Sequence, residues 1–325
     1  MTSIVKPLPL QSRIVHVDPW AELARSLEGL RGAFYASLAA SHGFLPGSPA
    51  DQECKRDTLG GSWGAQPVRD ANIAPLTAIS TVLDHLDSLG VLFKSPGGIT
   101  ASHTIARAAL DISIGPWFLL EPGIGERERV RRYMNLRLQS LKEQAQLETG
   151  APNTTIRQHA EGRIALILEA ARVHAFDVRR ERDRYKPPHL GAQTPSTTSL
   201  ASEIVAPNVP VLGALFWRLG SAVAHGQQHG LTMFFESIDQ PVQPTHGDAA
   251  AQMQASAKDT ALRCGGAPLA AISMLQRLYA QYGWPTDRLK TAVSGVISTW
   301  QSVAEVRPPR VPDAFLAGGR TPHQR

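Results

Sequence analysis

Three chemically capable side chains lie close together in the sequence, Arg218, Ser221 and His225. In a helix that turns by about 100° per residue they fall on one face. Imidazole can exchange a proton near neutral pH, a guanidinium group keeps its positive charge, and a hydroxyl group can donate or accept a hydrogen bond. The spacing therefore predicts a polar helix face that is a candidate site.

The element that must position these side chains is a helix over 210–226. Its opposite face carries an apolar stripe, which we expect to be buried: Leu212, Leu215, Phe216, Leu219 and Val223. Pro210 is suited to the first turn of the helix, and Gly226 is suited to end it. An ordinary amphipathic surface helix is the alternative interpretation of this pattern.

Arg218 and His225, with six residues between them, resemble the Arg-x(4–6)-His signature of the HEPN superfamily. The segment also resembles an Arg-x-x-Ser-x-x-x-His-Gly helix of bacterial all-helical proteins, in which an earlier Arg-Ala-x-x-Glu helix is common. Here that earlier helix has Arg107 and, in place of Glu, Asp111. HEPN proteins are helical bundles, often dimeric, and many are metal-independent RNases.

The resemblance implies a homodimer that cleaves RNA at the interface of its two copies. His225 would then be the general base or acid at the ribose 2′-hydroxyl, and Arg218 would neutralise the phosphate. Ser221 would orient the phosphate or the imidazole.

A second group of polar residues lies in a helix predicted over 100–120, where His103, Arg107 and Asp111 are spaced by four. Apolar residues flank this stripe on both sides, so we expect the helix to be central. An arginine and an aspartate inside a bundle must be paired, because an unpaired buried charge is very costly. The alternatives are an internal ion pair that fixes helix register and a polar pocket.

The helix predicted over 124–149 has a core stripe of Val130, Met134, Leu138, Leu141 and Ala145. Arg137 falls at the edge of this stripe, so we expect it to be buried and to face an acid, with Asp111 as the candidate, or to reach an anionic ligand. Arg107, Asp111 and Arg137 are thus the predicted ligand-binding residues. Arg129, Arg131 and Arg132 fall outside the stripe, where surface pairs with Glu126 and Glu128 are expected.

No metal or cofactor site is predicted. His225 and His229 are four apart, but Gly226 should break the helix between them. Cys54 and Cys264 form no Cys/His motif, and the chain has no glycine-rich nucleotide signature.

Apolar stripes at three-and-four spacing recur along the 325 residues and predict an all-α array of about eight helices with little or no strand. We expect a flexible arm over 1–16, a helical domain over 17–304 with possible substructures 17–186 and 196–304, and a mobile tail over 305–325. Asp18 and Pro19 are suited to cap and open the first helix, further helices are expected over 69–93 and 248–282, and one that begins at Thr154 or Thr155 should reach about residue 185. A linker rich in Pro, Ser and Thr is expected over 187–199. The loop over 43–67 should dock through Trp63, and 233–238 is a possible isolated strand.

The net charge of +5 permits RNA as a partner without requiring it. Without an apolar run of about 18 residues, the expectation is a cytoplasmic protein with no membrane partner.

Three functions remain open on the sequence: a HEPN-like RNase, a non-catalytic helical interaction or scaffold protein, and a helical protein that binds a small ligand. The surroundings of His225 and the presence or absence of a cavity beside Asp111 and Arg137 distinguish them.

Overall fold

The computed structural model describes residues 18–61, 63–95, 98–147, 154–180, 182, 186–209, 212–232 and 256–306. In these ranges the chain is an array of helices with one two-stranded sheet, so the all-α prediction is confirmed. The predicted arm, Pro210, the possible strand over 233–238 and all of the tail beyond Val306 lie outside the described residues.

Thirteen helices and two strands are described: α1 (Pro19–Ser41), α2 (Pro49–Lys55), α3 (Pro67–Ile73), α4 (Pro75–Phe93), α5 (Ile99–Leu119), α6 (Gly125–Ala145), α7 (Thr154–Val173), β1 (Val178–Arg179), β2 (His189–Leu190), α8 (Thr197–Val205), α9 (Leu212–Ala224), α10 (Gln228–Thr232), α11 (Ala257–Cys264), α12 (Gly266–Tyr282) and α13 (Asp287–Val303). The number exceeds the prediction because the expected loop contains α2 and α10 follows α9. In addition, the expected helix over 69–93 divides at Ala74, and the one expected over 248–282 divides at Gly265. Pro75 opens α4 directly after Ala74, since a proline suits a first turn that needs no N–H donor.

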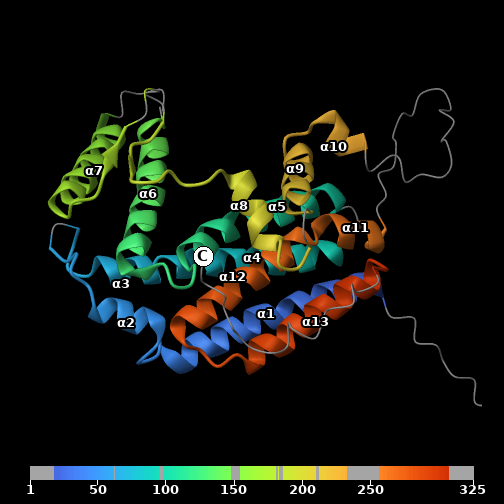
Figure 1. Cartoon of the computed structure of the whole chain (residues 1–325). Coiled ribbons are helices and arrows are strands. Elements are labelled where there is room, and N and C mark those ends of the chain that lie inside the picture. Colours follow the sequence, from blue (N-terminus) through green and yellow to red (C-terminus); the bar gives the residue numbers. More distant parts are fainter. Residues whose placement is uncertain are drawn as a thin grey trace, which may run out of the picture.

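The main core is built on α4 and α5, which pack along each other, with α1 and α12 beside them (Figure 1). The first and last helices, α1 and α13, lie side by side. The start of α1 follows the expected pattern, since the Asp18 side chain accepts a hydrogen bond from the Trp20 backbone N at 3.0 Å and Pro19 is the first helical residue. The main core takes residues from both sides of the predicted linker over 187–199.

A second apolar cluster lies at one end of the array, where α6 packs against α7 and against α3 (Figure 1). The antiparallel pair β1–β2, with Val178 opposite Leu190, covers part of it. Trp63 docks onto α7, as predicted: its Nε1 donates to the Ile167 carbonyl at 3.0 Å, and its ring lies 5.1 Å from that of Phe176.

The helix predicted to reach residue 185 ends instead at Val173. Ala175 has a φ of 53°, in the left-handed region that α-helices do not use. Arg127 of α6 donates to the carbonyls of His174 and Ala175, which satisfies groups that the end of α7 leaves without helical partners.

One stretch in the described ranges, α3 together with α4, has the length and composition of a membrane-crossing helix. In this fold the stretch is divided at Ala74, and its side chains Ile79, Val82, Leu83, Leu86 and Leu89 are buried in the main core. A core helix of a folded domain has the same length and composition, so the stretch is weak evidence for a span.

Three arginines cover the carboxyl end of α5. Arg277 donates to the carbonyl of Trp117 at 2.6 Å, and Arg132 donates to that of Phe118 at 2.8 Å. Arg129 donates to the carbonyl of Leu119. The last carbonyls of a helix lack intrahelical donors and carry partial negative charge, so these three cations satisfy and stabilise that end.

Arg129 is fully buried, at 0% exposure, which corrects the expectation of a surface residue. Its Nε and Nη2 lie 2.7 and 2.9 Å from the two carboxylate oxygens of Glu53 on α2. Asn72 and Gln281 donate to the same carboxylate. The position of Arg129 on its own helix gave no sign that α2 covers it. Arg131 and Arg132 do pair with Glu128 as expected.

The Glu53 carboxylate is held ionised by these neighbours. Burial alone raises its pKa, but the hydrogen bonds and charge of Arg129 and the amides of Asn72 and Gln281 keep it, on balance, below its ordinary value of 4.5. The stabilisation from the pair is therefore present above pH 4.5 and is lost as the pH falls through the lower folded-state pKa.

Glu53→Gln should destabilise the fold by about 3–5 kcal/mol at neutral pH, because it leaves the Arg129 charge buried without an acid. The difference from wild type should narrow below pH 4.5, where the wild-type carboxylate is itself protonated. Urea unfolding at several pH values measures both effects. Glu161→Gln is the control, since the Glu161–Arg157 pair is exposed and should contribute little.

Candidate functional site

Glycines decide which face of α9 is buried. A Cβ on Gly220 would lie 2.8 Å from the Cβ of Arg107 on α5, and one on Gly213 would collide with the Ala201 carbonyl of α8. These two residues, seven apart, share one face, and they let α5 and α8 approach the backbone of α9 closely. The predicted apolar stripe is therefore buried only in part: Leu212 and Leu215 are 38% and 47% exposed, whereas Phe216 packs against the main core. Among the predicted stripe residues, Val223 is buried.

The three predicted catalytic residues lie together on the outer side of α9. Arg218 and His225 are exposed and Ser221 is half-buried. His225 follows the last residue of the helix and still donates its backbone N–H to the Ser221 carbonyl, at 3.0 Å. Gly226, with a φ of 64°, ends the helix as predicted. Because Arg218 and His225 are exposed, this face is open to a partner.

His229 belongs to the next helix, α10, so the two histidines do not share one helix. In the parts of the chain that the structure describes, no three His, Cys, Asp or Glu side chains are arranged to hold a metal ion.

Arg107 and Asp111 form an ion pair within α5, which confirms that these two charges are paired. Trp217 of α9 completes the group, and the sequence interpretation missed it. Its Nε1 donates to Asp111 Oδ1 at 2.8 Å, and its carbonyl accepts from Arg107 Nε at 3.1 Å. The guanidinium carbon of Arg107 lies 4.2 Å from the centre of the Trp217 ring. A half-buried indole needs a hydrogen-bond acceptor for its N–H. This need was the available indication in the sequence that Trp217 pairs with a nearby acid.

The charge of Arg107 survives this burial. Desolvation lowers its pKa to about 10, which leaves the group protonated at neutral pH and able to neutralise Asp111. His103 is buried on the same helix, and its Nδ1 lies 3.3 Å from the Ser102 hydroxyl oxygen.

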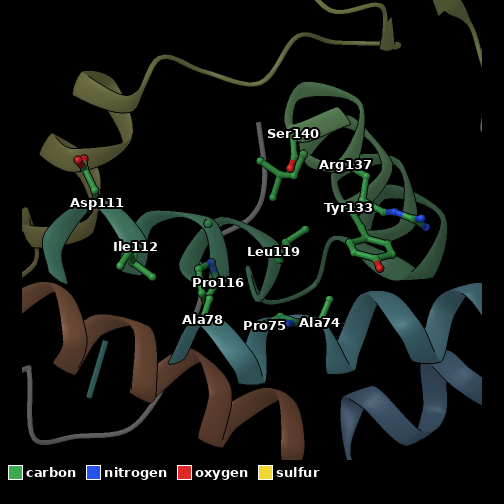
Figure 2. A pocket seen from close by; sticks show the side chains of 12 residues that line it. Ala74, Pro75, Ala78, Asp111, Ile112, Pro116, Leu119, Tyr133, Arg137 and Ser140 are labelled. Atoms are coloured by element: carbon green, nitrogen blue, oxygen red, sulfur yellow. The ribbon is translucent and has the colours of Figure 1, made fainter. Parts of the chain in front are cut away.

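The predicted pairing of Arg137 with Asp111 is wrong. Arg137 is half-buried, and its guanidinium carbon lies 5.5 Å from the ring centre of Tyr133, one turn earlier on α6. Both oxygens of Asp111 are already engaged, by Arg107 and Trp217. Figure 2 shows Asp111 at one end of a cleft and Arg137 with Tyr133 at the other.

This cleft lies between α4, α5 and α6 and has a volume of about 330 Å³. Its walls are mostly small or apolar: Ala74, Pro75, Ala78, Ile112, Gly115, Pro116, Leu119 and Leu136, with Asp111, Tyr133, Arg137 and Ser140 as the polar members. Asp111 and Arg137 thus share a cavity, as the ligand-pocket hypothesis expected. Arg107 stands outside the lining and contacts it through Asp111.

Comparison of the chain with models of protein families, with curated proteins and with solved structures finds no match. The two candidate sites, the outer face of α9 and the cleft between α4, α5 and α6, are therefore interpreted from their own residues.

Gly220→Ala should destabilise the fold by about 1–3 kcal/mol, because the added methyl group overpacks the contact with Arg107. Thermal or urea unfolding measures the change. Gly162→Ala is the matched control: nothing lies within 4 Å of a Cβ built there, and alanine is the better helix former. Equal stability of the two variants would contradict the proposed close approach of α9 to α5.

Proposed function

We propose that the chain binds a small, largely apolar molecule in the cleft between α4, α5 and α6. The observation that carries the proposal is an apolar-walled cavity with two charged residues at opposite ends that do not pair with each other. Its volume of about 330 Å³ falls at the lower end of the range for small-molecule sites, about 300–1,000 Å³.

The walls of the cleft are held in place by groups that do not line it. The α4 and α5 walls belong to the main core. The α6 wall is anchored by the contact of Arg129 with Glu53 and by the contact of Arg132 with the end of α5. A cavity whose walls are fixed in advance loses less conformational entropy when a ligand binds, which favours affinity.

Ala78→Phe should fill the cleft and weaken binding of a neutral apolar probe, N-phenyl-1-naphthylamine, about tenfold or more. Fluorescence titration measures the affinity, and unfolding curves check that the variant folds. Ala165→Phe is the control, because Ala165 is exposed on α7 and outside the lining. Absence of saturable binding to wild type, or equal binding by both variants, would refute the ligand proposal.

A second candidate function is RNA cleavage on α9, which the exposure of Arg218 and His225 on one face favours. In such a reaction the ribose 2′-oxygen attacks phosphorus, and the bond to the 5′-oxygen breaks to leave a cyclic phosphate. His225 would accept the 2′-hydroxyl proton, and Arg218 would neutralise the phosphate. A second copy would supply the proton to the 5′-oxygen, and the exposed Leu212 and Leu215 offer it an apolar contact.

His225→Ala should abolish RNA cleavage without changing the unfolding curve, since the side chain is exposed and its loss opens no cavity. Cleavage by wild type should persist in EDTA. His229→Ala, an exposed histidine on α10, should retain activity. Wild-type protein that leaves varied RNA substrates intact would remove this second candidate and would not affect the ligand proposal.

A further inference from the structure

We infer that the ligand of the cleft between α4, α5 and α6 is an amphipathic monoanion, whose acidic head binds Arg137 and whose apolar body extends toward Asp111. The inference rests on the proposed function and specifies the chemistry of its ligand. It follows from three features of the cleft: the state of Arg137, the state of Asp111 and the composition of the walls.

Arg137 differs from the other arginines of its helix. Arg127 donates to carbonyls of α7, Arg129 binds Glu53, and Arg131 and Arg132 bind Glu128. Arg137 rests on the Tyr133 ring, and within the described ranges it forms no ion pair.

An unneutralised guanidinium group at the edge of an apolar cavity favours an anion, and its planar fork matches a carboxylate. Tyr133, which lines the same end and contacts Arg137, adds a hydroxyl group that can act as a hydrogen-bond donor. The head group is therefore expected at the α6 end of the cleft (Figure 2).

Asp111 makes the opposite end unsuitable for a second anion. Its carboxylate is paired with Arg107 and accepts a hydrogen bond from Trp217, and the other lining residues at this end offer no donor for a second acid. A dicarboxylate would place its second acid against this group. A cationic group of a ligand would also gain little binding affinity at this end, because both oxygens of Asp111 already accept from donors. Asp111 therefore selects for a ligand with one charge, at the Arg137 end.

The walls between the two ends offer no strong hydrogen-bonding side chain. Ala78, Ile112, Pro116, Leu119 and Leu136 present methyl and methylene groups, and Gly115 adds a position without a side chain. An alkyl or aryl chain buries apolar surface against such walls and loses no hydrogen bond.

The test is displacement of the neutral probe by four molecules of equal chain length: octanoate, octanol, octylamine and octanedioate. Wild-type protein should bind octanoate most tightly.

Arg137→Gln should weaken the binding of octanoate about 10- to 100-fold, which is the effect of losing a charge-assisted hydrogen bond. The variant should leave the binding of octanol unchanged. Lys142→Gln removes the same charge from α6 at a position outside the lining of the cleft, and it should leave the affinities for all four molecules unchanged. Asp111→Asn should reduce the preference for octanoate over octanedioate.

The outcomes separate the two proposals. If octanol or octylamine displaces the probe as well as octanoate does, or if Arg137→Gln leaves the order unchanged, the monoanion inference is wrong while the cleft remains a binding site. If neither the probe nor any of the four molecules binds, the proposed function itself is wrong.

Discussion

The carboxyl end of α5 is the point on which the rest of the structure depends. Its last carbonyls would be left without donors inside the protein, and each of three consecutive ones receives an arginine. One of these arginines, Arg129, is itself wholly buried and requires Glu53 of α2 as its counter-charge. The need to satisfy one helix end thus joins α2, α5, α6 and α12. The sheet and α7 then pack on the side of α6 that remains.

The part of α5 that precedes its carboxyl end is joined to α9 by a different set of contacts. Gly220 lets the side chain of Arg107 lie against the α9 backbone, and Trp217 closes hydrogen bonds to both Arg107 and Asp111. Asp111 therefore belongs both to the α5–α9 contact and to the lining of the cleft. Asp111 thus contacts both the cleft and α9, the latter through the indole N–H of Trp217.

The two candidate sites differ in what the fold supplies to each. The cleft is bounded by three helices whose relative positions are fixed by buried ion pairs and core packing, so its geometry is complete in a single chain. The face of α9 presents Arg218, Ser221 and His225 from one helix, with Arg218 and His225 exposed. Binding in the cleft requires only a ligand, whereas chemistry on α9 requires a partner that completes the site. This difference is why the geometry favours the cleft.

Properties that depend on local spacing could be predicted from the sequence. Apolar residues at three-and-four spacing established the all-α class, Asp18 with Pro19 located the start of the first helix, and Gly226 located the end of α9. The pairing of Arg107 with Asp111 was also local, since residues four apart on a helix are neighbours.

The tertiary structure alone decided which arginine is buried, which face of α9 is covered and where a cleft opens. A helical wheel orders side chains around one axis, but burial depends on what packs against that axis. Arg129 is buried because α2, distant in sequence, covers it, and Arg137 is not, although it lies nearer the apolar stripe of α6. Leu212 and Leu215 are exposed because two glycines allow closer backbone packing on another face. The sequence determined the elements and their local pairs, and contacts between distant segments determined the site.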